Sequence, residues 1–216
     1  MIKLSSNTLK RSAAAPLMIS ALLCASCVSL LPEPAPAPSI YRLTQSPVSA
    51  EPISGAPSLR IAVPDAETAL QGADVVVSLD GRRLAFAAGA RWSQPIPELL
   101  QDAAMQSLAQ SGNLITITPP TVVRADYTLE PVIRAFEASF DRGEESPPLA
   151  KIRILVTLTD MKSRQVIAKK EFYGEQRATE VRVTSIVNAL DSLTQTVMAE
   201  MAVWTERSLA AAPAGS

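Results

Sequence analysis

The residues of this sequence that could do chemistry are two cysteines near its start and two neighbouring glutamates further on. The thiols of Cys24 and Cys27 could be acylated, and the carboxylates of Glu144 and Glu145 could act as an acid and base pair. The sequence contains no histidine, which excludes Ser-His-Asp and Cys-His catalysis. Adjacent glutamates in a segment rich in Gly and Pro are more typical of a solvated hairpin tip. We therefore predict no catalytic residue, no metal site and no cofactor.

The first 26 residues have the composition of a secretory signal peptide. Lys3, Lys10 and Arg11 form a positively charged start, and an apolar run occupies residues 13–24. This run is far shorter than the roughly 20 apolar residues that a membrane-spanning helix needs. We therefore expect the chain to be exported without a transmembrane segment.

The small residues Ala25 and Ser26 come directly before Cys27. This order resembles the bacterial lipoprotein signal, in which the cysteine is acylated and becomes the first residue of the mature protein. Cys27 is therefore the predicted lipidation site, with cleavage between Ser26 and Cys27. Cys24 is the weaker candidate because the bulky Leu23 precedes it. The match at Cys27 has one departure, since Cys24 stands three positions before Cys27, where the pattern prefers an aliphatic residue. The alternative is an ordinary cleaved signal with two incidental cysteines.

Removal of the signal leaves one cysteine, so an intramolecular disulfide is not possible. Removal of the signal also makes the net charge more negative than the −1 of the full sequence, because the signal carries basic residues and no acidic ones. Such a chain lacks the basic surface that nucleic acids or anionic lipids require, so membrane attachment is expected through the acyl chains of Cys27. Ser29 is not the aspartate that retains enteric lipoproteins at the inner membrane, which favours the outer membrane by analogy.

Residues 27–40 contain four alternating prolines, which favour an extended spacer of some 20 to 30 Å. Residues 41–206 are predicted to form one α/β domain and residues 207–216 a disordered tail. Within the domain, hydrophobic periodicity and turn residues predict eight strands and two helices. The strands are expected at 41–43, 59–63, 73–79, 83–87, 114–118, 126–140, 150–159 and 166–174.

The first helix is expected between an N-cap at Ser93 and a C-terminal Gly112, and the second over residues 184–205. Pro131 lies inside the longest expected strand, which predicts an edge position or a bulge. The fold class is therefore α/β, with a mixed but mostly antiparallel sheet and two amphipathic helices packed on it. In the strand at 150–159 the alternation predicts one buried and one largely polar face.

Several short motifs occur in an order that resembles the ABC-type transport auxiliary lipoproteins. They follow the lipoprotein signal and the Pro-rich spacer, and the likeness covers roughly residues 20–206. The motifs are Tyr41-Arg42-Leu43, Ala90-Arg91-Trp92, Arg124-Ala125-Asp126-Tyr127, Ile133-Arg134-Ala135-Phe136-Glu137 and Val203-Trp204-Thr205. The resemblance implies a non-enzymatic subunit beside an Mce-type lipid transporter, whose other parts are an ATPase, a permease and an Mce-domain protein. The resemblance is also compatible with the assembly of several copies of the chain into a homo-oligomer.

The candidate partner interface consists of Tyr41, Arg42, Leu43, Arg91 and Trp92. Trp and Arg are enriched among binding hot spots, but a Trp at this place is more often part of the core, and Tyr41-Arg42-Leu43 is more simply an edge strand. The function expected from the resemblance is a periplasm-facing, lipid-anchored docking subunit in the cell envelope. The alternative is a stand-alone envelope lipoprotein that binds lipid or polymer in an apolar groove between helix and sheet.

Overall fold

A long central strand, β7, organises the sheet of this protein. In the computed structural model, which describes residues 37–45, 47, 50–118, 121 and 123–212, strand β8 pairs with one edge of β7 and strand β9 pairs with β8, both antiparallel. The other edge of β7 pairs with three short strands in turn, β2, β3 and β4, all parallel to it. The strands are β1 (Ser39–Tyr41), β2 (Ser58–Ile61), β3 (Asp65–Ala66), β4 (Asp74–Leu79), β5 (Arg83–Trp92), β6 (Ile115–Ile117), β7 (Tyr127–Ser139), β8 (Leu149–Asp160) and β9 (Gln165–Arg177).

Three further pairings complete the nine-stranded sheet. Strand β5 forms an antiparallel hairpin with β4 and carries β1 on its outer edge, whereas β6 lies on the outer edge of β2. The longest ladders, β7 with β8 and β8 with β9, are antiparallel. The expected fold class, a mixed and mostly antiparallel sheet with two helices in one domain, is confirmed.

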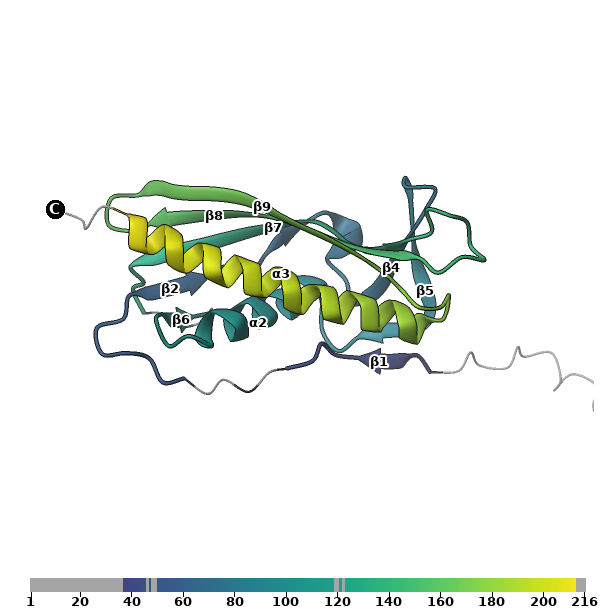
Figure 1. Ribbon diagram of the computed structural model, residues 1–216, viewed down its shortest axis with the longest axis horizontal. Coiled ribbons are helices and arrows are strands. Elements are labelled where there is room, and N and C mark those ends of the chain that lie inside the picture. The colour runs from purple at the N-terminus through teal and green to yellow at the C-terminus, as the bar shows by residue number, and fades with distance from the viewer. Residues whose placement is uncertain (1–36, 46, 48–49, 119–120, 122, 213–216) are drawn as a thin grey trace, which may run out of the picture. The chain divides into compact units, whose positions relative to one another are not determined.

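Two α-helices lie on the same face of the sheet (Figure 1). Helix α2 (Ile96–Ala109) packs beside β2 and β6, and α3 (Val183–Ala211) runs along β7, β8 and β9. A 3₁₀ turn, η1 (Thr68–Leu70), follows β3. At Gly174 in β9, a Cβ atom would lie only 2.7 Å from Leu193 Cδ1, so the absent side chain lets α3 approach the strand closely. The fully buried Phe136, Ile152 and Ile154 lie in the core of the domain.

The opposite face of β8 and β9 carries charged side chains. Arg153 pairs with Glu171 at 3.0 Å, and Lys151 with Glu175 at 3.9 Å. The predicted division of β8 into a buried and a largely polar face is confirmed. Charged residues therefore gather on the sheet face that the two helices leave open.

Pro131 does not mark an edge strand, because β7 has partners on both sides. The carbonyl of Leu129 accepts a hydrogen bond from Ala62 N–H, and alternate residues of a strand point their backbone groups to the same side. The nitrogen of Pro131 therefore faces the gap between the end of β2 and the start of β3, where no partner needs an N–H. The other expectation for Pro131 was a bulge, and a register shift does occur nearby, between Ile133 and Ala135.

Several expected boundaries are wrong, among them the ends of the second strand, the first helix and the last strand, which lie at Ile61, Ala109 and Arg177. Strand β1 starts at Ser39, inside the expected spacer, and β5 continues to Trp92 through an irregular stretch in which Gly89 has a φ of +69°. Helix α2 has Pro95, not Ser93, at its N-cap and makes no side-chain cap. Helix α3 continues to Ala211, so residues 207–211 are helical, because alanine favours helix and an existing helix needs no new nucleation.

Candidate partner-binding site

The sheet brings together the two separated motifs that were proposed as a partner interface. Strand β1 lies parallel to the end of β5, with Tyr41 opposite Trp92 and Ile40 opposite Arg91. The N–H of Ser93 donates to the carbonyl of Tyr41 at 2.6 Å, which closes the pairing. Among the described strands, β1 has β5 as its partner on one side and no strand on the other, so it is an edge strand.

Trp92 belongs to the core rather than to the surface. Its side chain is 2% exposed, and its ring lies 5.6 Å from that of Phe136. Its Nε1 has no hydrogen-bond partner within the described residues. Leu43, at 5% exposed, is also in the core. These two side chains position the edge, and they present little surface to a partner.

The exposed part of the edge consists of Ile40, Arg42 and Arg91. Ile40 is 63% exposed, and Arg42 projects from the segment that follows β1. The guanidinium of Arg91 forms an ion pair with Asp74 on β4, with 3.1 Å between Nε and Oδ1. Tyr41 is half-buried against the core. The edge thus offers backbone groups of β1 that no other described strand pairs with, next to two arginines and an exposed isoleucine.

The chain that leaves β1 is fastened to α3. Asp191 accepts hydrogen bonds from the backbone N–H and the hydroxyl of Thr44, at 2.8 and 2.6 Å. The side chain of Gln195 donates to the carbonyl of Thr44 at 2.9 Å. This contact holds the exit of β1 in one place and joins the edge to the helical layer.

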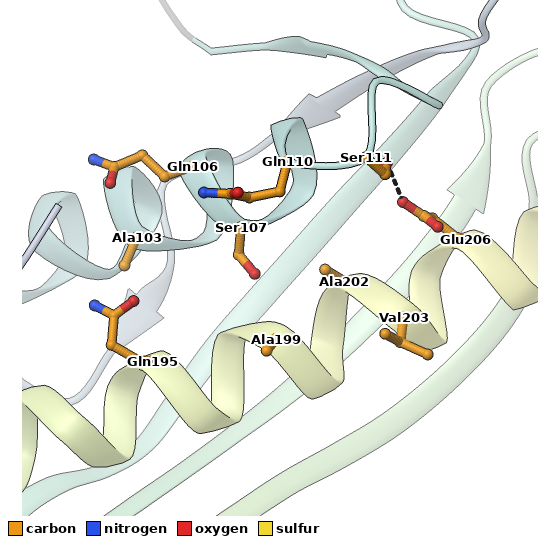
Figure 2. Close-up of a pocket in the computed structure, with 10 residues that line it drawn as sticks. All are labelled: Ala103, Gln106, Ser107, Gln110, Ser111, Gln195, Ala199, Ala202, Val203 and Glu206. Atoms are coloured by element: carbon orange, nitrogen blue, oxygen red, sulfur yellow. Dashed lines mark hydrogen bonds between the residues drawn. The ribbon is translucent and has the colours of Figure 1, made fainter. Parts of the chain in front are cut away.

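A groove between α2 and α3 was not predicted from the sequence. Figure 2 shows Ala103 and Ser107 of α2 opposite Gln195 and Ala202 of α3, and the cavity has a volume of about 470 Å³. Small and uncharged polar side chains dominate its lining. The sequence did contain a signal for a groove beside the last helix, because the exposed positions of this helix carry hardly any charge. The prediction rested only on the apolar stripe of the helix.

One end of this groove is closed by a hydrogen-bonded corner. Glu206 of α3 accepts hydrogen bonds from the hydroxyl of Ser111, drawn in Figure 2, and from the side chain of Asn113. Gly112 between them has a φ of +70°, and a Cβ atom there would lie 2.7 Å from the carbonyl oxygen of Glu51. The corner therefore joins three segments, the turn after α2, the chain before β2, and α3.

Glu144 and Glu145 are exposed in the loop between β7 and β8, as expected for a hairpin tip. The neighbouring carboxyl of Asp141 has its pKa held below the usual value by the Arg177 guanidinium, which donates two hydrogen bonds to it. Burial raises the pKa of Glu137 on β7, while Ser78 and Lys151 act in the opposite direction. Both pKa shifts thus follow from the fold, the lowered one from an ion pair and the raised one from burial.

Cys24, Cys27 and most of the spacer lie outside the described residues. Among the residues that are described, no group of three or more potential ligands is placed to hold a metal ion. None of the helices in the described part of the chain is both long and apolar enough to cross a membrane.

Solved structures of similar fold come from several bacteria. Protein XCC0632 from Xanthomonas campestris, of the family DUF330, has a TM-score of 0.69 and 23% identity, covering 80% of this chain and 97% of its own. An uncharacterized protein has a TM-score of 0.62 and 17% identity, covering 79% and 99%. The hypothetical protein CT253 from Chlamydia trachomatis has a TM-score of 0.50 and 10% identity, covering 76% and 100%. These likenesses concern the fold alone.

No curated protein matches the chain significantly. A family model does match, over residues 41–202, and its description is ABC-type transport auxiliary lipoprotein component. This match spans nearly the whole described domain, from β1 into the second half of α3. The chain therefore belongs to the ABC-type transport auxiliary lipoprotein component family.

Proposed function

We propose that this chain is a non-enzymatic, periplasm-facing subunit of an Mce-linked lipid ABC transport system. The observation that carries the proposal is the family match over residues 41–202. In this proposal, Cys27 carries the acyl anchor, with the outer membrane favoured, and the spacer lets the domain reach its partners. The ATP hydrolysis belongs to another subunit, since the sequence has no phosphate-binding glycine loop.

The surface that we propose for docking is the edge formed by β1 and the end of β5. It begins where the spacer ends, at Ser39, so the anchored chain reaches this edge first. An unpaired strand edge can accept a strand from another protein through backbone hydrogen bonds. The exposed Arg42 and Arg91 would add specificity, because arginine is enriched at protein interfaces.

A co-purification experiment tests the proposal. The full-length chain with a C-terminal tag is purified from membranes, and co-purifying proteins are quantified by mass spectrometry. We expect enrichment of the Mce-domain protein, the permease and the ATPase over an untagged strain. Arg42→Glu should reduce this enrichment, whereas Lys169→Glu, an equal charge change on β9, should not. Enrichment of none of the three subunits would contradict the proposal.

The second candidate function is a stand-alone lipoprotein that binds an envelope lipid. A mostly apolar cleft of about 440 Å³ favours it; this cleft lies beside the end of α3 and is lined by Pro57, Leu114, Tyr127 and Leu209 among others. Native mass spectrometry of the purified chain separates the two functions. A carrier should retain lipid in a fixed ratio beyond its own acyl chains, whereas a docking subunit should not.

A further inference from the structure

The outward face of α3 carries few charges for an exposed helix. The residues exposed along it are Thr184, Asn188, Ser192, Thr196, Ala199, Glu200, Val203, Arg207, Ala210 and Ala211. Solvent-facing helix surfaces usually carry many charged residues, and depletion of charge is a property of interface centres. The charged side chains of this domain gather instead on the open face of β8 and β9.

The four charged residues of α3 fall into two groups. Asp191 and Glu206 are bound within the domain, to Thr44 and to Ser111. Glu200 and Arg207 have neither an ion pair nor a hydrogen bond to any side chain in the described part of the chain. They are seven residues apart, so they lie on the same side of the helix but about 10 Å apart along its axis. At that spacing they do not form the usual pair between neighbouring turns.

Between these two charges lies a ridge with a hollow on each side. Val203 is 48% exposed at its centre, and Trp204 beside it is partly exposed although its ring packs against Phe172. The groove between α2 and α3 lies on one side, and a cleft of about 440 Å³ towards Lys170 of β9 lies on the other. Ala199 and Val203 line both. A ridge flanked by hollows is the shape that packs against another helix.

We propose that two copies of this chain pair through the C-terminal half of α3. The two helices run antiparallel about a two-fold axis near Val203 and Trp204, and Glu200 of each copy faces Arg207 of the second copy. The charges themselves argue for a second copy. A two-fold axis through an exposed apolar centre brings each negative charge opposite the positive charge of the second copy, so two ion pairs form. The surface is therefore self-complementary. This inference does not depend on the proposed transport role.

Cysteine cross-linking in intact membranes tests the pairing. Val203→Cys is introduced into the full-length chain, and membranes are treated with a short bis-maleimide. We expect a cross-linked species of twice the mass. The unsubstituted chain controls for Cys24 and Cys27, and Ser192→Cys is the matched control, because this exposed position of α3 has no counterpart near it in the second copy. Absence of the dimer with Val203→Cys would overturn the proposal.

Charge reversal identifies the partner. In the Val203→Cys background, Glu200→Arg places like charges opposite each other twice, and we expect about a tenfold or greater loss of cross-linked dimer. The double variant Glu200→Arg with Arg207→Glu exchanges the two charges and should restore the dimer. Both side chains are exposed, so the fold should be unaffected, which circular dichroism checks. Failure of the double variant to restore the dimer would contradict the pairing of Glu200 with Arg207 of the second copy.

Discussion

Arg91 and Trp92 are neighbours in the sequence, but their side chains have opposite surroundings. Successive residues of a strand point to opposite faces, so β5 directs Trp92 into the core and Arg91 to the surface. The sequence allowed either role for the tryptophan, and the core was the preferred interpretation. Burial settles it, because a side chain that is 2% exposed has almost no surface left for a partner.

Substitution separates these two roles. Trp92→Ala should lower the free energy of unfolding by about 3 to 5 kcal/mol, because it leaves a large cavity beside Phe136. Arg91→Ala should cost less than about 1 kcal/mol, because its pair with Asp74 is half-exposed. Urea unfolding followed by tryptophan fluorescence and circular dichroism measures both. Equal costs for the two variants would contradict the assignment of Trp92 to the core.

A second prediction at the residue scale concerns Asp141 and Arg177, which join the loop after β7 to the end of β9. The guanidinium donates to both carboxylate oxygens, at 2.9 and 2.8 Å, and holds the pKa of Asp141 below its usual value of 3.8. A lowered pKa means that the folded state binds the proton less readily than the unfolded state. The stabilisation from this pair is therefore complete at pH values above the pKa of Asp141 in the unfolded state. It is lost as the pH falls through the pKa of Asp141 in the folded state.

We expect wild-type protein to lose more unfolding free energy than Asp141→Asn between about pH 5 and pH 2. Urea unfolding at a series of pH values gives the two curves, which should differ at neutral pH and approach each other in acid. Glu144→Gln controls for the loss of one negative charge from the same loop. Parallel curves for wild type and Asp141→Asn would show that this pair contributes nothing.

At the scale of elements, the sequence predicted the order and type of nearly every strand and helix. Strong alternation identified β8, and the apolar stripe identified α3, because these patterns follow directly from burial on one face. The ends were harder, because tertiary contacts determine them. The irregular part of β5 is held by its pairing with β1, and the position of Pro131 is explained only by the gap between β2 and β3.

The turn after α2 shows how one glycine holds several elements together. Gly112 has a φ of +70°, its carbonyl accepts a hydrogen bond from Ile53 N–H, and a Cβ atom would meet the backbone of Glu51. Gly81 in the β4–β5 hairpin has the same φ, but a Cβ atom there would have no atom of the described residues within 4 Å, beyond its immediate chain neighbours. The two positions therefore have the same φ but differ in the room that is free for a side chain.

Gly81→Ala should cost about 1 kcal/mol, which reflects the left-handed conformation alone. Gly112→Ala should cost about 1 to 3 kcal/mol more, because backbone atoms must move to admit the methyl group. Thermal unfolding of both variants, compared with wild type, measures the difference. If Gly112→Ala is no more destabilising than Gly81→Ala, the close contact with Glu51 is not part of the folded state.

At the scale of the whole molecule, the candidate site was only partly predictable. The two motifs of the edge were identified as separate segments, and their parallel pairing could not be foreseen because it depends on a connection of almost fifty residues. The groove between α2 and α3 was missed because it arises from the packing of two helices. The low charge on the exposed positions of α3 is a signal from one helix, and it does not specify which face of α2 lies opposite.

Anchoring to the membrane is the other prediction at this scale. Cys27→Ser should release the exported chain into the soluble envelope fraction, because acyl chains are its expected attachment. Cys24→Ser should leave it in the membrane fraction. Fractionation followed by immunoblotting distinguishes the two variants. Release by Cys24→Ser but not by Cys27→Ser would move the lipidation site to Cys24.

Site-specific photo-cross-linking in living cells tests the docking role most directly. A photoreactive amino acid replaces Ile40 on the β1 edge or, as a matched control, Val166 on β9, since both are strand residues with similar exposure, 63% and 60%. We expect position 40 to form adducts with the Mce-domain protein or the permease, and position 166 to form none with either. Adducts at position 40 that contain no transporter subunit, or identical adducts at both positions, would contradict the docking role.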